Sequence, residues 1–394
     1  MKRGKVECSE LFAMIPENLI KKLEEQTRVD HQVKKLSGIL TLKLLLFSLL
    51  NSERISLRVM EEIFNSDQFK IFAKKENQKT KHSTIGDRIT NINYEFFEKI
   101  YFSLNEKIQL PGKSISKSFR NIHIYDSTLV SLSAKLLHIG MFSGGSETKK
   151  QIKFSIGINN GFPASVLLFK NQPEVSEEIA LREAVLKVNY SPGSVILFDR
   201  GVRKRKTFCE FCDKDISFVT RLHENARYNK IRKFKEVDGR KTETLLLKKD
   251  LVVKLLGEKN VPTKNEFRLI IAASLKTKQP ILFLTNIFDL NAREITDLYK
   301  KRWEIEVFFK FLKQELNFKH FVSRSENGIK VMMYATLILA ALLLIYKKRN
   351  RISSYKIAKV RFASELEMEI IKEIVLLCNG DISKFKKLRN SAYT

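Results

Sequence analysis

Cysteine is scarce in this sequence, with four in 394 residues, and this scarcity excludes a fold that depends on a disulfide framework. Cys209 and Cys212 form one CxxC pair. No second pair follows at zinc-ribbon spacing, so we predict two half-buried helical cysteines rather than a metal site. Internal repeats and long low-complexity tracts are absent, and residues 1–10 are charged, unlike a secretory signal. These absences predict a globular protein of a reducing cytoplasm.

Acidic residues are too few to balance the basic ones. The 44 Asp and Glu stand against 72 Lys and Arg, which gives a formal net charge of +28. Solubility requires some net charge, but not this much of one sign. A polyanionic partner explains the excess, because each neutralised phosphate releases condensed counterions. We therefore predict a nucleic acid as partner, with a generally basic proteome as the alternative explanation.

Long apolar runs are also missing, apart from the segment 331–346 with the sequence VMMYATLILAALLLIY. This run is shorter than the ~20 residues that a helix needs to cross a bilayer. Three basic residues follow it directly. We predict a buried core helix and no membrane association; a membrane-spanning helix is the alternative.

The period of the apolar residues changes along the chain, from helical spacing to strand-like alternation near residue 119 and back again after residue 281. The pattern predicts an α/β protein with a mixed-sheet core, interrupted by a β-rich insertion and flanked by helical regions. The expected segments are 1–118 (helical), 119–222 (first part of the core), 223–280 (insertion), 281–330 (second part of the core) and 331–394 (helical).

A single long helix is predicted from about residue 291 to 316. At about 100° per residue, Tyr299, Arg302, Glu306 and Lys313 fall within about 60° of one another, beside a separate apolar face. A phenol, two cations and a carboxylate would then share one stripe. An exposed face with ion pairs, such as Arg302 with Glu306 four residues later, is the alternative explanation.

Two aspartates favour the functional explanation of this helix. Asp126 lies within a predicted strand, IHIYDST, and Asp199 ends another, VILFDRG. Divalent cations prefer oxygen ligands, and two such ions about 4 Å apart can activate an attacking oxygen and stabilise a leaving one. Carboxylates on rigid elements suit this chemistry, because small displacements cost large factors in rate. We therefore predict that Asp126, Asp199 and Glu306 converge on a two-metal site.

The spacing Tyr299-x2-Arg302-x3-Glu306-x6-Lys313 resembles the Tyr–Arg–Glu–Lys signature of the IS-four-type DDE transposases of bacterial insertion sequences. The segments YDST and FDRG resemble the two aspartate motifs of that family. The leading segments IPENLI, HQVKKLSG, ISLRVMEEIF and KHSTIGDRI resemble its N-terminal helical region. The resemblance therefore covers nearly the whole chain.

The resemblance implies a ribonuclease H-like core whose three carboxylates bind two Mg²⁺ ions, with Mn²⁺ as a substitute. The enzyme would bind the terminal inverted repeats of its element, nick the DNA ends and join the freed 3′-hydroxyl to target DNA. Arg302 and Lys313 would hold phosphates beside the cut bond, and Tyr299 would support the bound end. The N-terminal region would bind DNA, and the protein would act in the bacterial cytoplasm at the nucleoid.

The β-rich insertion is expected to contact DNA as well, because its cations are dense beside the aromatic residues Tyr228 and Phe234. The expected DNA-binding residues of the insertion are Arg227, Lys230, Arg232, Lys233 and Lys235. A solvated loop is the alternative. Relatives that form hairpin intermediates use a tryptophan of the insertion, whereas the single tryptophan here, Trp303, lies in the signature helix. The hairpin route therefore stays open.

Assembly into a homodimer is expected, because an element has two ends and both must be cut. The helix near residues 365–377 offers Leu366, Ile370, Ile374 and Leu377 at helical spacing as an interface. Two other classes of protein remain as alternatives. One is a different ribonuclease H-like nuclease, such as a junction resolvase, and the other is a non-catalytic DNA-binding protein.

Overall fold

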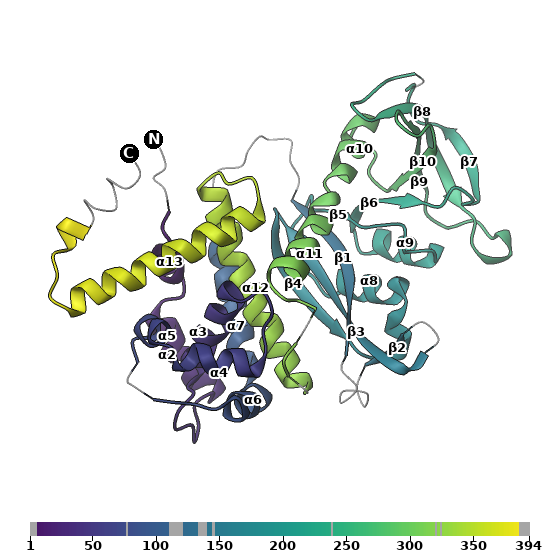
Figure 1. The fold of residues 1–394 in the computed structure, drawn as a ribbon. Helices are drawn as coiled ribbons and strands as arrows, with labels where there is room; N and C mark the ends of the chain where they lie inside the picture. Colours follow the sequence, from purple (N-terminus) through teal and green to yellow (C-terminus); the bar gives the residue numbers. More distant parts are fainter. Residues whose placement is uncertain are drawn as a thin grey trace. The chain divides into compact units, whose positions relative to one another are not determined.

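Two compact units make up the chain, and each is described by itself (Figure 1). The computed structural model describes residues 6–75, 78–109, 121–132, 140–143, 146–237, 239–319, 321–323 and 325–385. The helical unit combines Met1–Gly112 with Lys310–Thr394, and the α/β unit is Lys113–Phe309. The segments 1–118 and 331–394, predicted as helical, thus both contribute helices to the first unit.

The helical unit is built around one apolar helix. Its helices are α1 (Cys8–Phe12), α2 (Glu17–Thr27), α3 (Gly38–Asn51), α4 (Leu57–Asn65), α5 (Asp67–Ala73), α6 (His82–Asn91), α7 (Tyr94–Gln109), α12 (Glu326–Arg349) and α13 (Tyr355–Leu377). α12 packs against α3, α6, α7 and α13. Among the described residues, α12 alone is long and apolar enough to cross a membrane, and 94% of its apolar window is buried inside the protein. Its apolar run therefore forms the core of this unit.

The α/β unit contains one mixed sheet. Its strands are β1 (Ile122–Ser131), β2 (Met141–Ser143), β3 (Ser146–Asn159), β4 (Phe162–Phe169), β5 (Val195–Leu197), β6 (Ser217–Leu222), β7 (Tyr228–Lys233), β8 (Leu245–Leu255), β9 (Phe267–Ser274) and β10 (Pro280–Thr285). The strand order is β2-β3-β1-β5-β6-β10-β9-β8-β7. β4 lies off this path and pairs with β3. β5 runs parallel to both β1 and β6, whereas the remaining pairs are antiparallel.

Helices cover both faces of this sheet. Successive side chains of a strand point to opposite faces, so apolar residues are available on each face for a helix to cover. On one face, α8 (Glu177–Leu186) and α9 (Arg205–Asp213) bury a cluster that includes Phe198, Phe208 and Phe218. Leu282 and Leu284 of β10 belong to the same cluster. Phe283 points the other way and packs on Tyr299 of α10 (Ala292–Lys300). The alternation along β10 thus places α10 on the face opposite α8 and α9.

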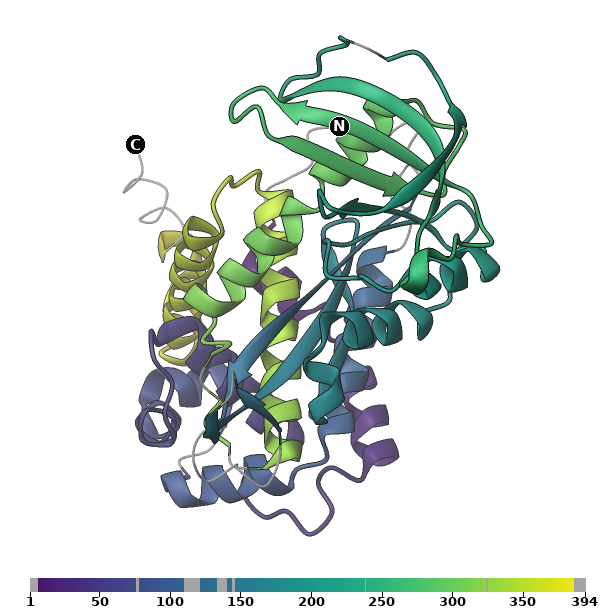
Figure 2. The same ribbon diagram turned by 90° about the vertical axis from the view of Figure 1, so that its right-hand side faces the viewer.

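The segment 223–280 extends this sheet rather than forming a sheet of its own (Figure 2). β10 pairs with β6 and then with β9, and β8 and β7 follow in order. The basic strand β7 lies at the outer edge of the sheet, and its residues from Asn229 to Lys233 are all exposed to solvent. Its cations are therefore carried by the same rigid sheet as Asp126.

The predicted helix 291–316 is two helices, so the prediction of one continuous helix is wrong. α10 ends at Lys300, and α11 (Trp303–Glu315) begins after two turn residues. The N–H groups of Lys301 and Arg302 bond the carbonyls three residues earlier, on Leu298 and Tyr299. These tighter bonds shift the rotation per residue, and a constant step of about 100° no longer applies across the junction.

A buried ion pair links the strands of segment 223–280 to the residues just before α10. Arg268 and Asp250 have no exposed side-chain surface, and Arg268 donates two hydrogen bonds to Asp250 at 2.9 and 2.7 Å. The same guanidinium donates to the carbonyls of Ile287 and Leu290, just before α10. The Phe234 ring stacks over it at 4.4 Å. The pair therefore ties the strands of segment 223–280 to the start of the helix that carries Tyr299.

We predict that Asp250→Ala destabilises the protein by about 3–5 kcal/mol, because it leaves the Arg268 charge buried without a counter-ion. The double variant Arg268→Met with Asp250→Leu is the matched control, since it removes both charges and keeps the volume. It should recover most of the lost stability. Urea unfolding measures both. A single variant that costs under about 1 kcal/mol would show that the pair is not the tie described here.

Candidate active site

The register of two parallel strands brings the predicted aspartates together. Ile124 of β1 lies opposite Leu197 of β5. Asp126 and Asp199 each follow that pair by two residues, so Asp126 lies midway along β1 and Asp199 lies just beyond the end of β5. Tyr125 belongs to the cluster under α8 and α9, and strand alternation therefore turns Asp126 toward the opposite face. The two carboxylates act on each other electrostatically.

The environment of Asp126 disfavours its charged form. Burial is the main cause that raises the pKa of Asp126 to about 6, and the neighbouring carboxylates Glu177 and Asp199 contribute to the rise. The N–H of Ser127, which donates to Asp126 Oδ1 at 2.8 Å, and the guanidinium of Arg302 act in the opposite direction. A cation placed at this carboxylate would relieve both the desolvation and the repulsion.

Helix α10 carries Tyr299 to the second aspartate. The Tyr299 hydroxyl donates to Asp199 Oδ1 at 3.2 Å, and the tyrosine ring packs on Phe283. Burial raises the pKa of Tyr299 well above its usual value, so the hydroxyl keeps its proton at neutral pH. The guanidinium of Arg302 lies 5.7 Å from the centre of the same ring. Tyr299 thus holds the orientation of Asp199 as a neutral donor.

Arg302 connects the two aspartates with the predicted glutamate. It donates to Glu306 Oε1, and its charge acts on both Asp126 and Asp199. The ion pair four residues apart, which the sequence offered as the bland alternative, is therefore present, but it borders the aspartates. Lys313 lies further along α11, beyond the boundary between the units.

A fourth carboxylate, Glu177 in the first turn of α8, was missed by sequence reasoning. It accepts hydrogen bonds from Ser127 Oγ at 3.0 Å and from the buried Lys153 ammonium at 3.3 Å. A Cβ on Gly201 would lie 2.6 Å from Glu177 Cγ, so the glycine of the FDRG segment permits this close approach. The pair Glu177-Glu178 after Ser176 marks only a helix start, and no sequence signal links it to Asp126.

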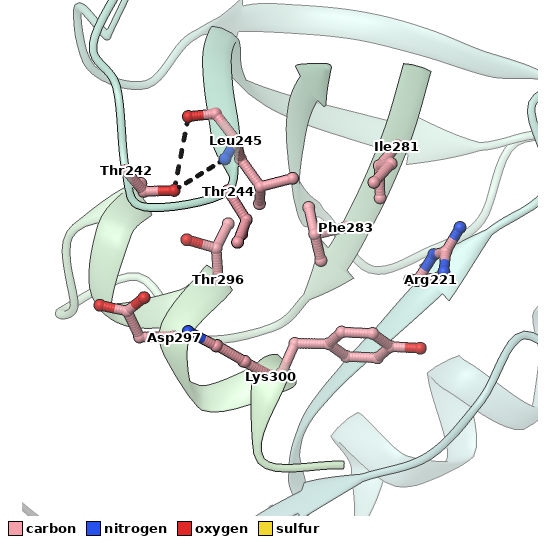
Figure 3. A pocket seen from close by; sticks show the side chains of 10 residues that line it. Arg221, Thr242, Thr244, Leu245, Ile281, Phe283, Thr296, Asp297 and Lys300 are labelled. Atoms are coloured by element: carbon pink, nitrogen blue, oxygen red, sulfur yellow. Dashed lines mark hydrogen bonds between the residues drawn. The ribbon is translucent and has the colours of Figure 1, made fainter. Parts of the chain in front are cut away.

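Two cavities border these residues. One, of about 650 Å³, is lined by Glu177, Asp199 and Arg200 together with Arg203 and Lys204. The other, of about 170 Å³, lies beside Tyr299 and is shown in Figure 3. Its labelled lining includes Arg221, Phe283 and Lys300. The first cavity combines the acidic site with several cations, so it suits an anionic substrate.

The donor chemistry of the site suits a hard divalent cation, because its acidic groups are carboxylates and one of them is held partly neutral by burial. Within the described ranges, however, no group of three or more His, Cys, Asp or Glu lies close enough to hold a metal ion. Asp126 and Asp199 influence each other directly, whereas Glu306 is engaged by Arg302. The two aspartates are thus the donors that the structure brings together.

The predicted cations of the insertion lie at the outer edge of the sheet. All five are exposed; they are Arg227, Lys230, Arg232, Lys233 and Lys235. Arg232 pairs with Glu266 at 3.2 Å. Phe234 packs against Arg268 and Phe288, and Tyr228 is half-buried, so neither ring is fully available for stacking on a base.

Comparisons with known proteins agree with this arrangement. Residues 117–343, more than half of the chain, match the family model of a transposase DDE domain, and residues 4–73 match a domain of unknown function, DUF4372. A protein of Synechocystis sp., named as a transposase for insertion sequence element IS4SA, is 24% identical over 290 residues, which cover 71% of this chain and 75% of that protein.

Two further relatives carry similar names. A protein of Geobacillus stearothermophilus, named as a transposase for insertion sequence element IS5377, is 22% identical over 299 residues, 73% of this chain and 74% of the relative. A Sinorhizobium fredii protein named as transposase y4zB is 29% identical over 167 residues, 41% of this chain and 45% of the relative. The chain therefore belongs to the transposase DDE-domain family and is a DDE-type transposase of an insertion sequence.

Proposed function

We propose that this transposase binds the terminal inverted repeats of its element, cleaves the DNA ends and joins them to target DNA at a site formed by Asp126, Asp199 and Glu306. The register of β1 and β5 carries the proposal, because Asp126 and Asp199 each follow the last pair of this register by two residues. The Arg302–Glu306 pair borders them from the junction of α10 and α11. Incubation with candidate element ends and Mg²⁺, followed by mapping of any cut, tests it.

The family implies a divalent metal cofactor, and we propose two Mg²⁺ ions, for which Mn²⁺ can substitute, held by Asp126, Asp199 and Glu306. Such ions, when bound, activate the attacking oxygen and stabilise the leaving one. Tyr299 fixes the orientation of Asp199. Arg302 donates to Glu306, and its guanidinium would also bind a phosphate of the DNA.

The strand order supports a ribonuclease H-like core. Five strands in the order β4-β3-β1-β5-β6 have antiparallel pairs among the first three and parallel pairs among the last three. That order is the one expected of the fold, with the first aspartate on the central strand. We assign residues 119–222 and 281–330 to the catalytic core. Residues 223–280 form a β-rich extension, and residues 331–394 form a C-terminal helical region.

DNA is the partner on which a transposase acts, and we propose specific contacts to it. Arg302 and Lys313 hold phosphates beside the cut bond, and Tyr299 supports the bound end. The N-terminal region 1–118 recognises DNA, and so do the exposed cations of segment 223–280, namely Arg227, Lys230, Arg232, Lys233 and Lys235. We place this activity in the cytoplasm, where the element resides on the bacterial nucleoid.

We predict that Asp126→Ala, Asp199→Ala or Glu306→Ala lowers cleavage of element ends by at least about 100-fold, the loss expected even for a small misplacement of a reacting group. End binding should change little, because a carboxylate contributes no phosphate contact. Glu304→Ala is the matched control, since Glu304 is an exposed acid on the same turn of α11. Full cleavage by any of the three variants removes that residue from the site.

We predict that Mn²⁺ raises the midpoint of thermal unfolding of the wild type. A ligand at about 100 times its Kd stabilises the folded state by about 2.7 kcal/mol. Asp126→Asn and Asp199→Asn should lose this shift, because each removes a charged ligand, whereas Glu304→Gln should keep it. Equal shifts in all four proteins would mean that the ion binds elsewhere.

We also propose a homodimer on paired ends, with an interface on α13 that includes only part of the predicted set. Leu366 and Ile370 of α13 are buried within the helical unit, so the prediction that they form an interface is wrong. Ile371, Ile374 and Leu377 are exposed, with Leu377 at 70%. We therefore propose that the interface uses Ile374 and Leu377 of the predicted set, together with Ile371.

We predict that Ile374→Asp with Leu377→Asp prevents pairing of two protomers on end DNA while single-end binding persists. Charges on this exposed strip oppose its burial in an interface. The conservative swap Ile374→Leu with Leu377→Ile serves as control and should pair normally. Light scattering with and without DNA measures the mass. Normal pairing by the aspartate variant would place the interface elsewhere.

A further inference from the structure

A second, larger cavity continues from the candidate active site. Arg203 and Lys204 line the cavity around Asp199, and they also line a neighbouring cavity of about 990 Å³. One wall of the latter is the loop and first turn of α9, residues 203–206, and the other is the segment 256–264 between β8 and β9. We name this cavity the α9 groove. The shared residues make the two cavities one path on the α/β unit.

The lining of the α9 groove is predominantly positive. Its cations are the four consecutive residues 203–206, Arg227, Lys259 and Lys264, and its single acid is Glu258. Lys264 pairs with Asp213 at 2.7 Å, and among the described residues no other cation of the lining forms an ion pair. Like charges gathered in a groove create a strong positive potential that attracts anions.

The walls of the groove are held by the fold. The buried carboxylate of Glu178 accepts hydrogen bonds from the N–H groups of Arg203 and Lys204 at 2.5 and 2.9 Å, and from the Thr207 hydroxyl at 2.6 Å. Across the groove, Arg205 Nε donates to the carbonyl of Leu256 at 3.4 Å. The cations are therefore positioned by packed backbone before any ligand arrives, which reduces the entropy lost on binding.

The remaining lining indicates which part of a nucleic acid the groove fits. No aromatic side chain is among the described residues that line it, so bases find no ring on which to stack. Cations without aromatic partners recognise phosphates, and phosphate contacts carry no sequence information. The expected ligand is therefore a sugar–phosphate backbone of any sequence.

We propose that the α9 groove binds the DNA backbone flanking the bond that is cut at Asp199, so that the DNA passes from one cavity into the other. This inference rests on the proposed function, since it takes Asp199 as the position of the cut. It adds a phosphate-binding surface that is separate from the signature cations Arg302 and Lys313. The groove then sets the path of the duplex and not the choice of sequence.

The test compares two triple variants of equal net charge in the full-length protein. Lys204→Gln, Lys206→Gln and Lys259→Gln remove three groove cations, and Lys187→Gln, Lys248→Gln and Lys276→Gln remove three exposed cations elsewhere on the same unit. The probe is a duplex of about 30 base pairs of random sequence, titrated at several salt concentrations. Each lost phosphate contact lowers the slope of log K against log salt by about 0.9. We expect a fall of about 2 to 3 units for the groove variant and under about 1 unit for the control.

Equal slopes for the two triple variants would contradict the proposal that the α9 groove binds DNA, whether or not the wild type cleaves element ends. A slope that falls only with one particular DNA sequence would also overturn it, because the lining predicts binding of any sequence. Failure of the proposed function would give a different experimental result. A wild type that binds with the steep slope but never cuts element ends retains the groove and rejects the catalytic assignment.

Discussion

The burial of Asp126 beside two further carboxylates is the constraint on which the candidate site of the α/β unit depends. Desolvation disfavours the charged form of Asp126 most, and the nearby carboxylates of Glu177 and Asp199 add to that effect. Nothing local in the sequence favours that arrangement. The parallel pairing of β1 with β5, the hydrogen bond from Tyr299 and the charge of Arg302 impose it. A bound cation would stabilise a buried carboxylate that has two others beside it, which suits a metal-dependent phosphoryl-transfer enzyme.

The structure shows where some of the cations behind the net charge of +28 lie on the α/β unit. Glu177 and Asp199 share a cavity with cations of the loop before α9, and a second group of cations lies at the outer edge of segment 223–280. Because β7, β8 and β9 belong to the same sheet as β1, the cations and carboxylates share one rigid support. The buried Arg268–Asp250 pair strengthens this link, since it bonds the carbonyls just before α10. A substrate phosphate is thereby positioned by the element that also positions the chemistry.

Errors of prediction arose where a regular period was carried through a local break. The stripe containing Tyr299 and Glu306 assumed one helix, whereas the tighter turn at Lys301 and Arg302 separates α10 from α11. On α13, apolar spacing located Leu366 and Ile370 on an interface, although the same spacing also describes a helix packed in its own core. Periodicity reveals that a face is apolar, and it carries no information about which neighbour covers that face.

Local sequence alone determined the elements that depend on local interactions. Alternation defined β1 around Asp126, a short apolar run defined β5 before Asp199, and the length of the run at 331–346 favoured a core helix over a membrane span. Tertiary structure decided everything that requires two distant segments to meet. The approach of Glu177 to Asp126, the path of cations from Asp199 into the α9 groove and the joining of segment 223–280 to the central sheet are of this kind. The physical reason is that each is fixed by strand register and side-chain packing between residues far apart in the chain, where no local period records the partner.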